Sequence, residues 1–141
     1  SDGTVFGTPE YLAPEQGAGR PADHRSDLYS VGVILYRMLS GRLPFRGTDK
    51  QAVIRDQMET HPAPFQRIGV EDVPPALEEV CFKLLAKDPA RRYQTAEDVR
   101  DALGKIDLRR APTRIRRHVA TAPKPLRTSV WRSPRAQGLA G

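Results

Sequence analysis

Apolar residues recur at helical spacing in three stretches of this 141-residue sequence. In the first stretch, which begins near Ser26, they stand mostly three or four positions apart: Leu28, Val31, Leu35, Met38 and Leu39. This spacing places them on one face of a helix, and Val33 and Ile34 widen that face. Gly41 is a typical residue just past a helix end. We therefore predict a long, largely buried helix from about Ser26 to Gly41.

The second stretch follows Pro74 and Pro75, which can open a helix because its first position needs no backbone N–H. Its apolar positions form an i, i+3, i+4, i+7, i+8 stripe, typical of a helix that packs on a core: Leu77, Val80, Cys81, Leu84 and Leu85. The third stretch follows Thr95, a predicted N-cap with Asp98 in the first turn, and its expected buried face is Val99, Leu103 and Ile106. A further helix is predicted after Thr48, whose hydroxyl is expected to cap it.

Glycine and proline punctuate residues 1–20, which favours an irregular loop with at most one short helical turn. No stretch alternates between apolar and polar residues for long enough to predict a sheet. We therefore predict a mainly α fold of about four to five helices after an N-terminal loop.

Charge divides the chain near Asp107. Residues 1–107 hold 14 Lys and Arg against 17 Asp and Glu, whereas residues 108–141 hold nine basic residues, four prolines and no acid. The high isoelectric point of about 9.9 therefore describes the second part. We expect residues 1–107 to form the domain and residues 108–141 to be a basic, Pro/Arg-rich disordered tail or linker.

Three interpretations of this tail remain open. Its arginines and Trp131 could contact the phosphates of nucleic acid or an anionic membrane surface. The plainer interpretation, which we favour, is a disordered linker after the domain. Translation past a frame disruption is the third.

Other features exclude several classes of protein. Cys81 is the single cysteine and cannot form an internal disulfide, and the three histidines are too scattered for a zinc site. The longest apolar run, residues 31–36, is interrupted by Arg37 far short of the roughly 18 residues that a transmembrane helix needs. With Ser1 at the start and no leader pattern, we interpret the chain as a fragment of a cytoplasmic protein.

Four clusters in the same order resemble the lower C-lobe of eukaryotic-type (Hanks-type) Ser/Thr protein kinases, and together they cover roughly residues 1–107. They are Gly7-Thr8-Pro9-Glu10-Tyr11-Leu12-Ala13-Pro14-Glu15-Gln16, Ser26-Asp27-Leu28-Tyr29-Ser30-Val31-Gly32, Gly41-Arg42-Leu43-Pro44-Phe45 and Leu85-Ala86-Lys87-Asp88-Pro89-Ala90-Arg91-Arg92-Tyr93. Tyr29, where many eukaryotic members have Trp, makes the resemblance closer to the bacterial branch.

The resemblance implies that the parent protein transfers the γ-phosphoryl group of ATP to Ser or Thr of protein substrates, with Mg²⁺. The family's Gly-rich loop, lysine, His-Arg-Asp and Asp-Phe-Gly motifs precede the Ala-Pro-Glu cluster, and nothing in this sequence matches them. We therefore expect no catalytic or cofactor-binding residue in this chain, no activity from it alone, and the missing N-lobe and catalytic loop as its partners. The alternative is a non-catalytic scaffold module whose basic tail binds a polyanion.

The first cluster resembles the family's P+1 loop, which shapes the pocket for the substrate residue after the phosphoacceptor. The resemblance assigns that role to Thr8, Pro9, Glu10, Tyr11 and Leu12, and Thr8 would also contact the missing catalytic Asp and Lys. Thr4 matches the activating phosphothreonine, with Ser1 and Thr8 as competing acceptors.

Three further residues have structural roles in the family. Glu15, in the first turn of a short helix, is expected to be partly buried and to need a cation, and the position that matches the family's arginine is Arg92. Asp27 either satisfies local amides at a helix start or, as the resemblance implies, holds the backbone of the catalytic loop. Without that loop, we expect a buried acceptor to lose its donors, which costs about 1–3 kcal/mol and loosens the structure locally.

Overall fold

The computed structural model describes residues 8–107, and within that range the chain is helical without any β-strand. The mainly α class predicted from the sequence is therefore confirmed. The elements in chain order are η1 (Pro9–Tyr11), α1 (Pro14–Gly17), α2 (His24–Ser40), α3 (Lys50–Glu59), η2 (Phe65–Ile68), α4 (Pro75–Leu84), η3 (Pro89–Arg91) and α5 (Ala96–Gly104), where η marks a 3₁₀ turn. None of the helices in residues 8–107 is both long and apolar enough to cross a membrane.

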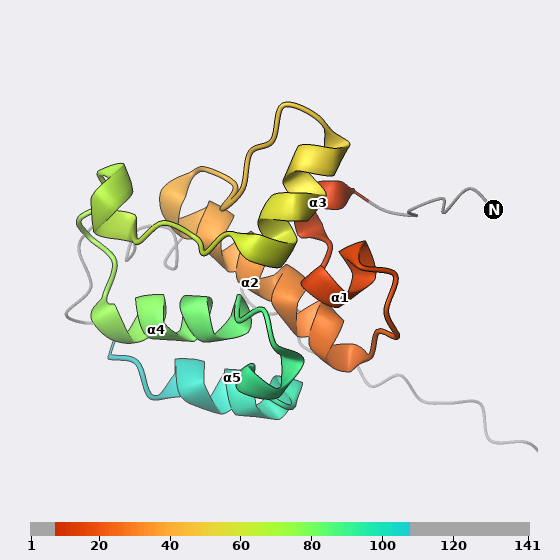
Figure 1. Cartoon of the computed structure of the whole chain (residues 1–141). Coiled ribbons are helices and arrows are strands. Elements are labelled where there is room, and N and C mark those ends of the chain that lie inside the picture. The colour runs from red at the N-terminus through yellow and green to blue at the C-terminus, as the bar shows by residue number, and fades with distance from the viewer. Residues whose placement is uncertain (1–7, 108–141) are drawn as a thin grey trace, which may run out of the picture.

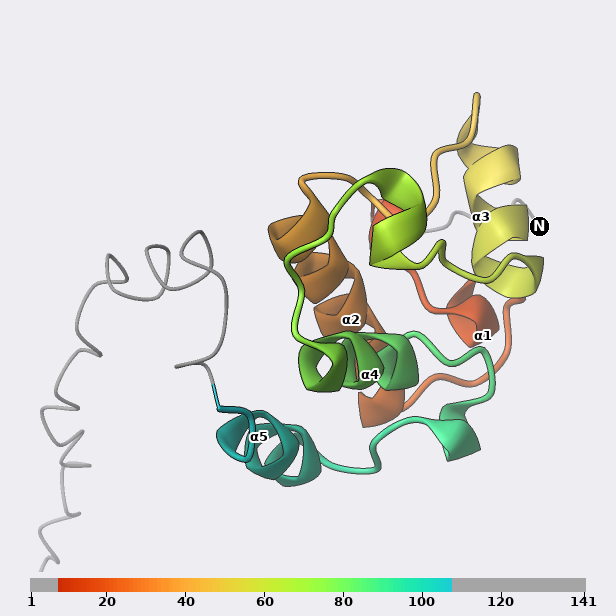
Figure 2. The same ribbon diagram turned by 90° about the vertical axis from the view of Figure 1, so that its left-hand side faces the viewer.

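Helix α2 is the element around which the others gather. In Figures 1 and 2, α1 and α3 lie together on one side of it, and α4 lies along another side with α5 beneath it. The helix begins where the Asp23 side chain accepts a hydrogen bond from the Arg25 amide at 2.8 Å, two residues before the predicted start. It ends at Gly41, whose φ of 73° is left-handed and suits glycine.

The core lies between α2 and α4. All five residues of the stripe predicted in the second stretch are buried. From α2, Tyr29, Val33 and Tyr36 face them, and Tyr36 stacks on Phe65 of η2 with ring centroids 4.9 Å apart. The apolar periodicity therefore predicted the buried face of α4 correctly, but of these three α2 residues it had placed only Val33 in the buried face.

Close approach of α2 and α4 depends on Gly32. A Cβ at this position would lie 2.8 Å from Cβ of Leu84, closer than side chains pack. We expect Gly32→Ala to lower the free energy of unfolding by about 1–2 kcal/mol, since overpacking outweighs the gain in helix propensity. Urea denaturation measures the change. Gly104→Ala is the matched control, because nothing lies within 4 Å of a Cβ there; equal stability of the two variants would contradict the expected steric effect.

Some expected details are wrong. The cap of α3 is Asp49, whose Oδ1 accepts from the Ala52 amide at 2.8 Å, and not Thr48. Both residues are good caps, and the carboxylate is the one that reaches the third amide. In α5, the capping by Thr95 and the burial of Val99 are confirmed, but Leu103 is 39% exposed. The predicted tail, residues 108–141, lies outside the described residues.

The outer face of α2 also differs from the expectation. Val31, Ile34 and Met38 are 43%, 47% and 76% exposed, although the pattern predicted them in the buried face. Asp27 lies on the same side, one helical turn before Val31, and is exposed. Apolar residues thus surround α2, but the described elements cover only part of its circumference.

Candidate functional site

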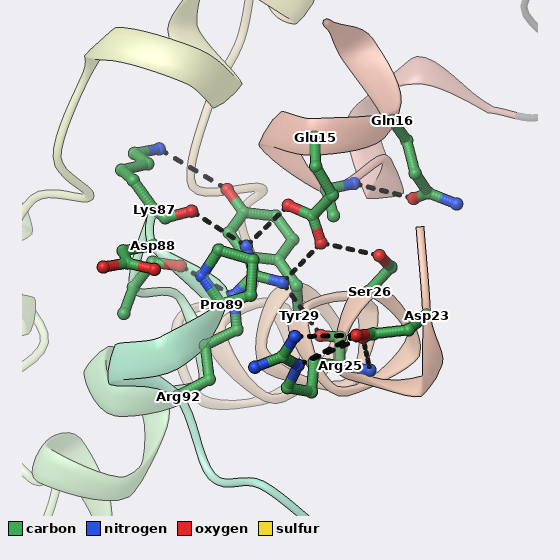
Figure 3. Close-up of polar contacts among 12 residues, drawn as sticks. Glu15, Gln16, Asp23, Arg25, Ser26, Tyr29, Lys87, Asp88, Pro89 and Arg92 are labelled. Carbon is green, nitrogen blue, oxygen red and sulfur yellow. Dashed lines mark hydrogen bonds and ion pairs between the residues drawn. The ribbon is translucent and has the colours of Figure 1, made fainter. Parts of the chain in front are cut away.

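The short helix α1 places Glu15 below the surface. Pro14 starts the helix, and the Gln16 side chain turns back so that its Oε1 accepts from the Ala13 amide at 2.9 Å. Glu15 then points toward the start of α2, where the Ser26 hydroxyl donates to its Oε1 at 2.6 Å (Figure 3). The carboxylate is only 9% exposed, so it needs a cation nearby.

Arg92, directly after η3, supplies that cation. Its Nη1 and Nη2 donate to the two carboxylate oxygens of Glu15 at 2.7 and 2.8 Å, which is the two-pronged pairing expected from the sequence. Nε donates to the Ala86 carbonyl, and the remaining protons of Nη1 and Nη2 reach the carbonyls of Arg25 and Lys87 (Figure 3). Every N–H donor of this fully buried guanidinium is therefore used.

The electrostatics of Glu15 follow from these contacts. Burial raises the pKa of its carboxyl, but the hydrogen bonds from Arg92 and Ser26 outweigh this and hold the pKa below its ordinary value of 4.5. The guanidinium also lies over the Tyr29 ring, 4.9 Å from its centroid. Glu15 is therefore a carboxylate at neutral pH, and the pair joins α1, α2 and the segment after α4.

The loop of the first cluster lies against α2 and α3. Thr8 is exposed, the residues of η1 are half-buried, and Leu12 is buried. Two α2 side chains hold Tyr11: the Ser30 hydroxyl donates to its carbonyl at 2.7 Å, and Arg37 donates to its hydroxyl at 2.6 Å. The five residues assigned to this loop thus form one continuous, partly accessible turn. Thr4 and Ser1 lie outside the described residues.

The carboxylate of Glu10 is unusual within this loop. Its Oε2 is buried and has no hydrogen-bond partner among the described residues. Buried acceptors of this kind usually pair with a protein donor or with ordered water.

The expectation for Asp27 is wrong in one respect. The residue is exposed and not buried, so the expected cost of an unpaired buried acceptor does not arise. The reason is its place on the outer face of α2, beside Val31, which the described helices leave open. Its proposed partner, a catalytic loop, would have to come from beyond residues 8–107.

Sequence reasoning missed a polar cluster beside this site. Gln57 of α3 is 1% exposed, although its position four residues after the buried Val53 was a signal that it faces the core. Its side chain contacts Tyr29 and the Glu10 carbonyl, and Lys87 donates to the Gln57 carbonyl at 2.7 Å. Burial lowers the pKa of Lys87 to about 8. Lys87 and Tyr29 stand inside the recognised clusters, but their mutual contact has no signature in the sequence.

The described residues hold no cluster of potential metal ligands. Within residues 8–107, no three His, Cys, Asp or Glu side chains come close enough together to hold a metal ion. The contacts described above hold a partly accessible loop against α2 and α3.

Comparison with known proteins supplies the family. The family model described as "Protein kinase domain" matches residues 2–102. The serine/threonine-protein kinase PknB of Mycolicibacterium smegmatis is 41% identical over 136 residues, which is 94% of this chain and 20% of that protein. The serine/threonine-protein kinase Pkn1 of Myxococcus xanthus is 44% identical over 102 residues, which is 72% of this chain and 14% of that protein. The chain thus spans a fifth or less of the length of these two relatives.

A solved structure shows the same arrangement of helices. The twitchin kinase region from C. elegans matches with a TM-score of 0.58 and 28% identity, covering 67% of this chain and 16% of that one. The helical bundle described above therefore corresponds to part of a kinase structure.

Proposed function

This chain belongs to the protein kinase domain family, as a bacterial-type Ser/Thr kinase sequence, and on that premise we propose that it is the substrate-docking and scaffold part of the C-lobe. The parent protein would transfer the γ-phosphoryl group of ATP to Ser or Thr of a protein. Here Thr8, Pro9, Glu10, Tyr11 and Leu12 would form the pocket for the substrate residue that follows the phosphoacceptor.

The buried pair of Glu15 and Arg92 is the observation that carries this proposal. Its pairing distances of 2.7 and 2.8 Å and its full set of donors make a rigid joint directly behind the loop. A loop that is anchored in this way can present the same shape to each substrate, because little order must be created on binding. The buried, unpartnered Oε2 of Glu10 adds an acceptor that a donor from outside could use.

The exposed face of α2 supports the proposal that the remainder of the kinase domain packs against this chain. Val31, Ile34 and Met38 are exposed on one side, with Asp27 at the end of the row. Figure 2 shows α1 and α3 together on one side of α2. A row of large apolar residues favours cover by another element, and the relatives contain much more chain than this one. Asp27 would then meet the backbone of the catalytic loop.

ATP and Mg²⁺ would bind to other parts of the parent protein, which carry the family motifs that these 141 residues do not match. Phosphoryl transfer depends on a phosphate-cradling loop, a lysine, metal-binding carboxylates and a base. We propose that the 141 residues alone therefore lack activity. Thr4 would be the activating phosphorylation site of the same parent.

An assay with ATP radiolabelled at the γ-phosphate tests whether the parent, and not the 141 residues alone, carries the activity. We expect the pure 141-residue chain to transfer no γ-phosphoryl group to protein or peptide, and the parent kinase to do so under the same conditions. A polypeptide that carries the preceding part of the domain, added in trans, is the informative third sample. Robust transfer by the 141 residues alone, or none by the parent, would contradict the proposal.

A further inference from the structure

A chain of buried polar groups connects helix α3 to the loop at η1, and Gln57 stands at its centre. The Gln57 amide nitrogen donates to the Glu10 carbonyl at 2.7 Å, and its amide oxygen accepts from the Tyr29 hydroxyl. Both the nitrogen and the oxygen of this amide are therefore hydrogen-bonded, and the residue is only 1% exposed. Burial of such a group is costly unless it is bonded, so its geometry is closely constrained.

Lys87 fixes the end of α3 from which Gln57 projects. Its ammonium donates to the Gln57 carbonyl at 2.7 Å and to the Asp56 carbonyl at 3.3 Å, and lies 4.2 Å from the centre of the Phe45 ring. The Gln57 carbonyl is one of the last carbonyls of α3, which a cation can satisfy, whereas the Asp56 carbonyl also accepts from the Thr60 amide at 2.9 Å. Gln57 is thus held through its backbone by Lys87 and through its side chain by Tyr29.

Two further side-chain hydrogen bonds to the loop come from α2. Ser30 and Arg37 bind the carbonyl and the hydroxyl of Tyr11, whereas Gln57 binds the carbonyl of Glu10, the residue before. Two neighbouring residues of the loop are therefore tied to two different helices. A change at Gln57 would let the Glu10 end of η1 shift while the Tyr11 end stayed fixed on α2.

We propose that Gln57 is a positioning residue. Through its hydrogen bond to the Glu10 carbonyl it sets where residues 9–12 lie relative to α3, and it so selects the substrate residue after the phosphoacceptor. This inference rests on the function proposed above for that loop. Tyr29 takes part in the arrangement, because its hydroxyl donates to the Gln57 amide oxygen and so orients the amide.

Hydrogen exchange on the 141-residue chain tests the positioning directly. In Gln57→Met, which keeps the length of the side chain but donates nothing, we expect the Tyr11 and Leu12 amides to exchange about fivefold faster, because they donate to the Thr8 and Pro9 carbonyls, at the end of the turn that Gln57 holds. The Val33 and Tyr36 amides in the middle of α2 should be unaffected. Gln51→Met, on the exposed side of the same helix, is the matched control. If Gln57→Met does not fold, Tyr29→Phe is the second variant. It keeps the ring but lacks the hydroxyl, and the exchange rate of the Tyr11 and Leu12 amides should rise by a smaller factor. Unchanged exchange at Tyr11 and Leu12 in a folded variant would overturn the inference.

Kinetics of the parent kinase test the selection. With peptides that differ only in the residue after the phosphoacceptor, we expect Gln57→Met to raise KM for the preferred peptide about fivefold and to flatten the preference. KM for ATP should not change. An equal fall of kcat for all peptides at constant KM would show only a loss of active enzyme and would overturn the inference. If the unaltered parent transfers no phosphoryl group, the proposed function fails, whereas an active parent with unaltered peptide preference in Gln57→Met refutes this inference alone.

Discussion

Replacement of Arg92 by methionine is expected to lower the free energy of unfolding by about 3–5 kcal/mol. The substitution removes the cation but leaves Glu15 buried, with Ser26 as the remaining side-chain donor to its carboxylate. It also leaves the carbonyls of Ala86, Arg25 and Lys87 without the donors that the guanidinium supplies. Urea denaturation of the 141-residue chain at neutral pH measures the difference.

Two comparisons separate this buried pair from an ordinary ion pair. Arg100→Met removes the cation of the pair with Asp101, whose side chains are 72% and 60% exposed, and should cost less than about 1 kcal/mol. The double change Arg92→Met with Glu15→Met should recover part of the loss, because no unpaired charge is then buried. If Arg92→Met and Arg100→Met destabilise the chain equally, the pair does not anchor the fold.

Acid is expected to weaken the fold through Glu15. Its pKa is below 4.5 in the folded chain, so the unfolded chain takes up a proton first as the pH falls. The stability that this carboxylate contributes is complete above about pH 4.5 and is lost as the pH falls toward the folded pKa, by at most about 1.4 kcal/mol per pH unit. Denaturation midpoints between pH 7 and pH 3 measure the trend.

Glu15→Gln isolates this contribution. The amide cannot titrate, so the variant should be less stable at neutral pH but should lose less on acidification. Asp23→Asn is the comparison on the surface: the pKa of Asp23 is lowered to about 2 by its hydrogen bonds with Arg25, but that carboxylate is exposed. An identical pH dependence of the unaltered chain and Glu15→Gln would show that Glu15 is not the group responsible.

Local patterns predicted the elements well because each pattern has a local cause. The α4 stripe, the glycine stop at Gly41 and the Thr95 cap depend on residues within one or two turns. The prediction at Thr48 was wrong for the same reason, since two adjacent residues could both cap and only their backbone geometry selects Asp49. The misplaced burial of Leu103 and Met38 had another cause: periodicity shows that a helix has an apolar face, but not how much of that face a neighbour covers.

The candidate site required more than periodicity. Glu15 and Arg92 are 77 residues apart, and their pairing was expected only because both stand in clusters that resemble a known family. Gln57, Tyr29 and Lys87 were not predicted as a unit, since a buried polar contact between distant segments leaves no spacing in the chain. Their partners are backbone carbonyls as much as side chains, and a carbonyl is present at every residue.

By itself, the amino-acid sequence determined the helices, the mainly α class and the kinase family of this protein. Helix periodicity, caps and family motifs each depend on residues that are close together in the sequence. The tertiary structure alone decided which face of α2 is covered, which donors surround Glu15 and how Gln57 reaches the Glu10 carbonyl. These depend on how helices distant in the chain pack, and packing selects one arrangement from many that the same periodicities allow.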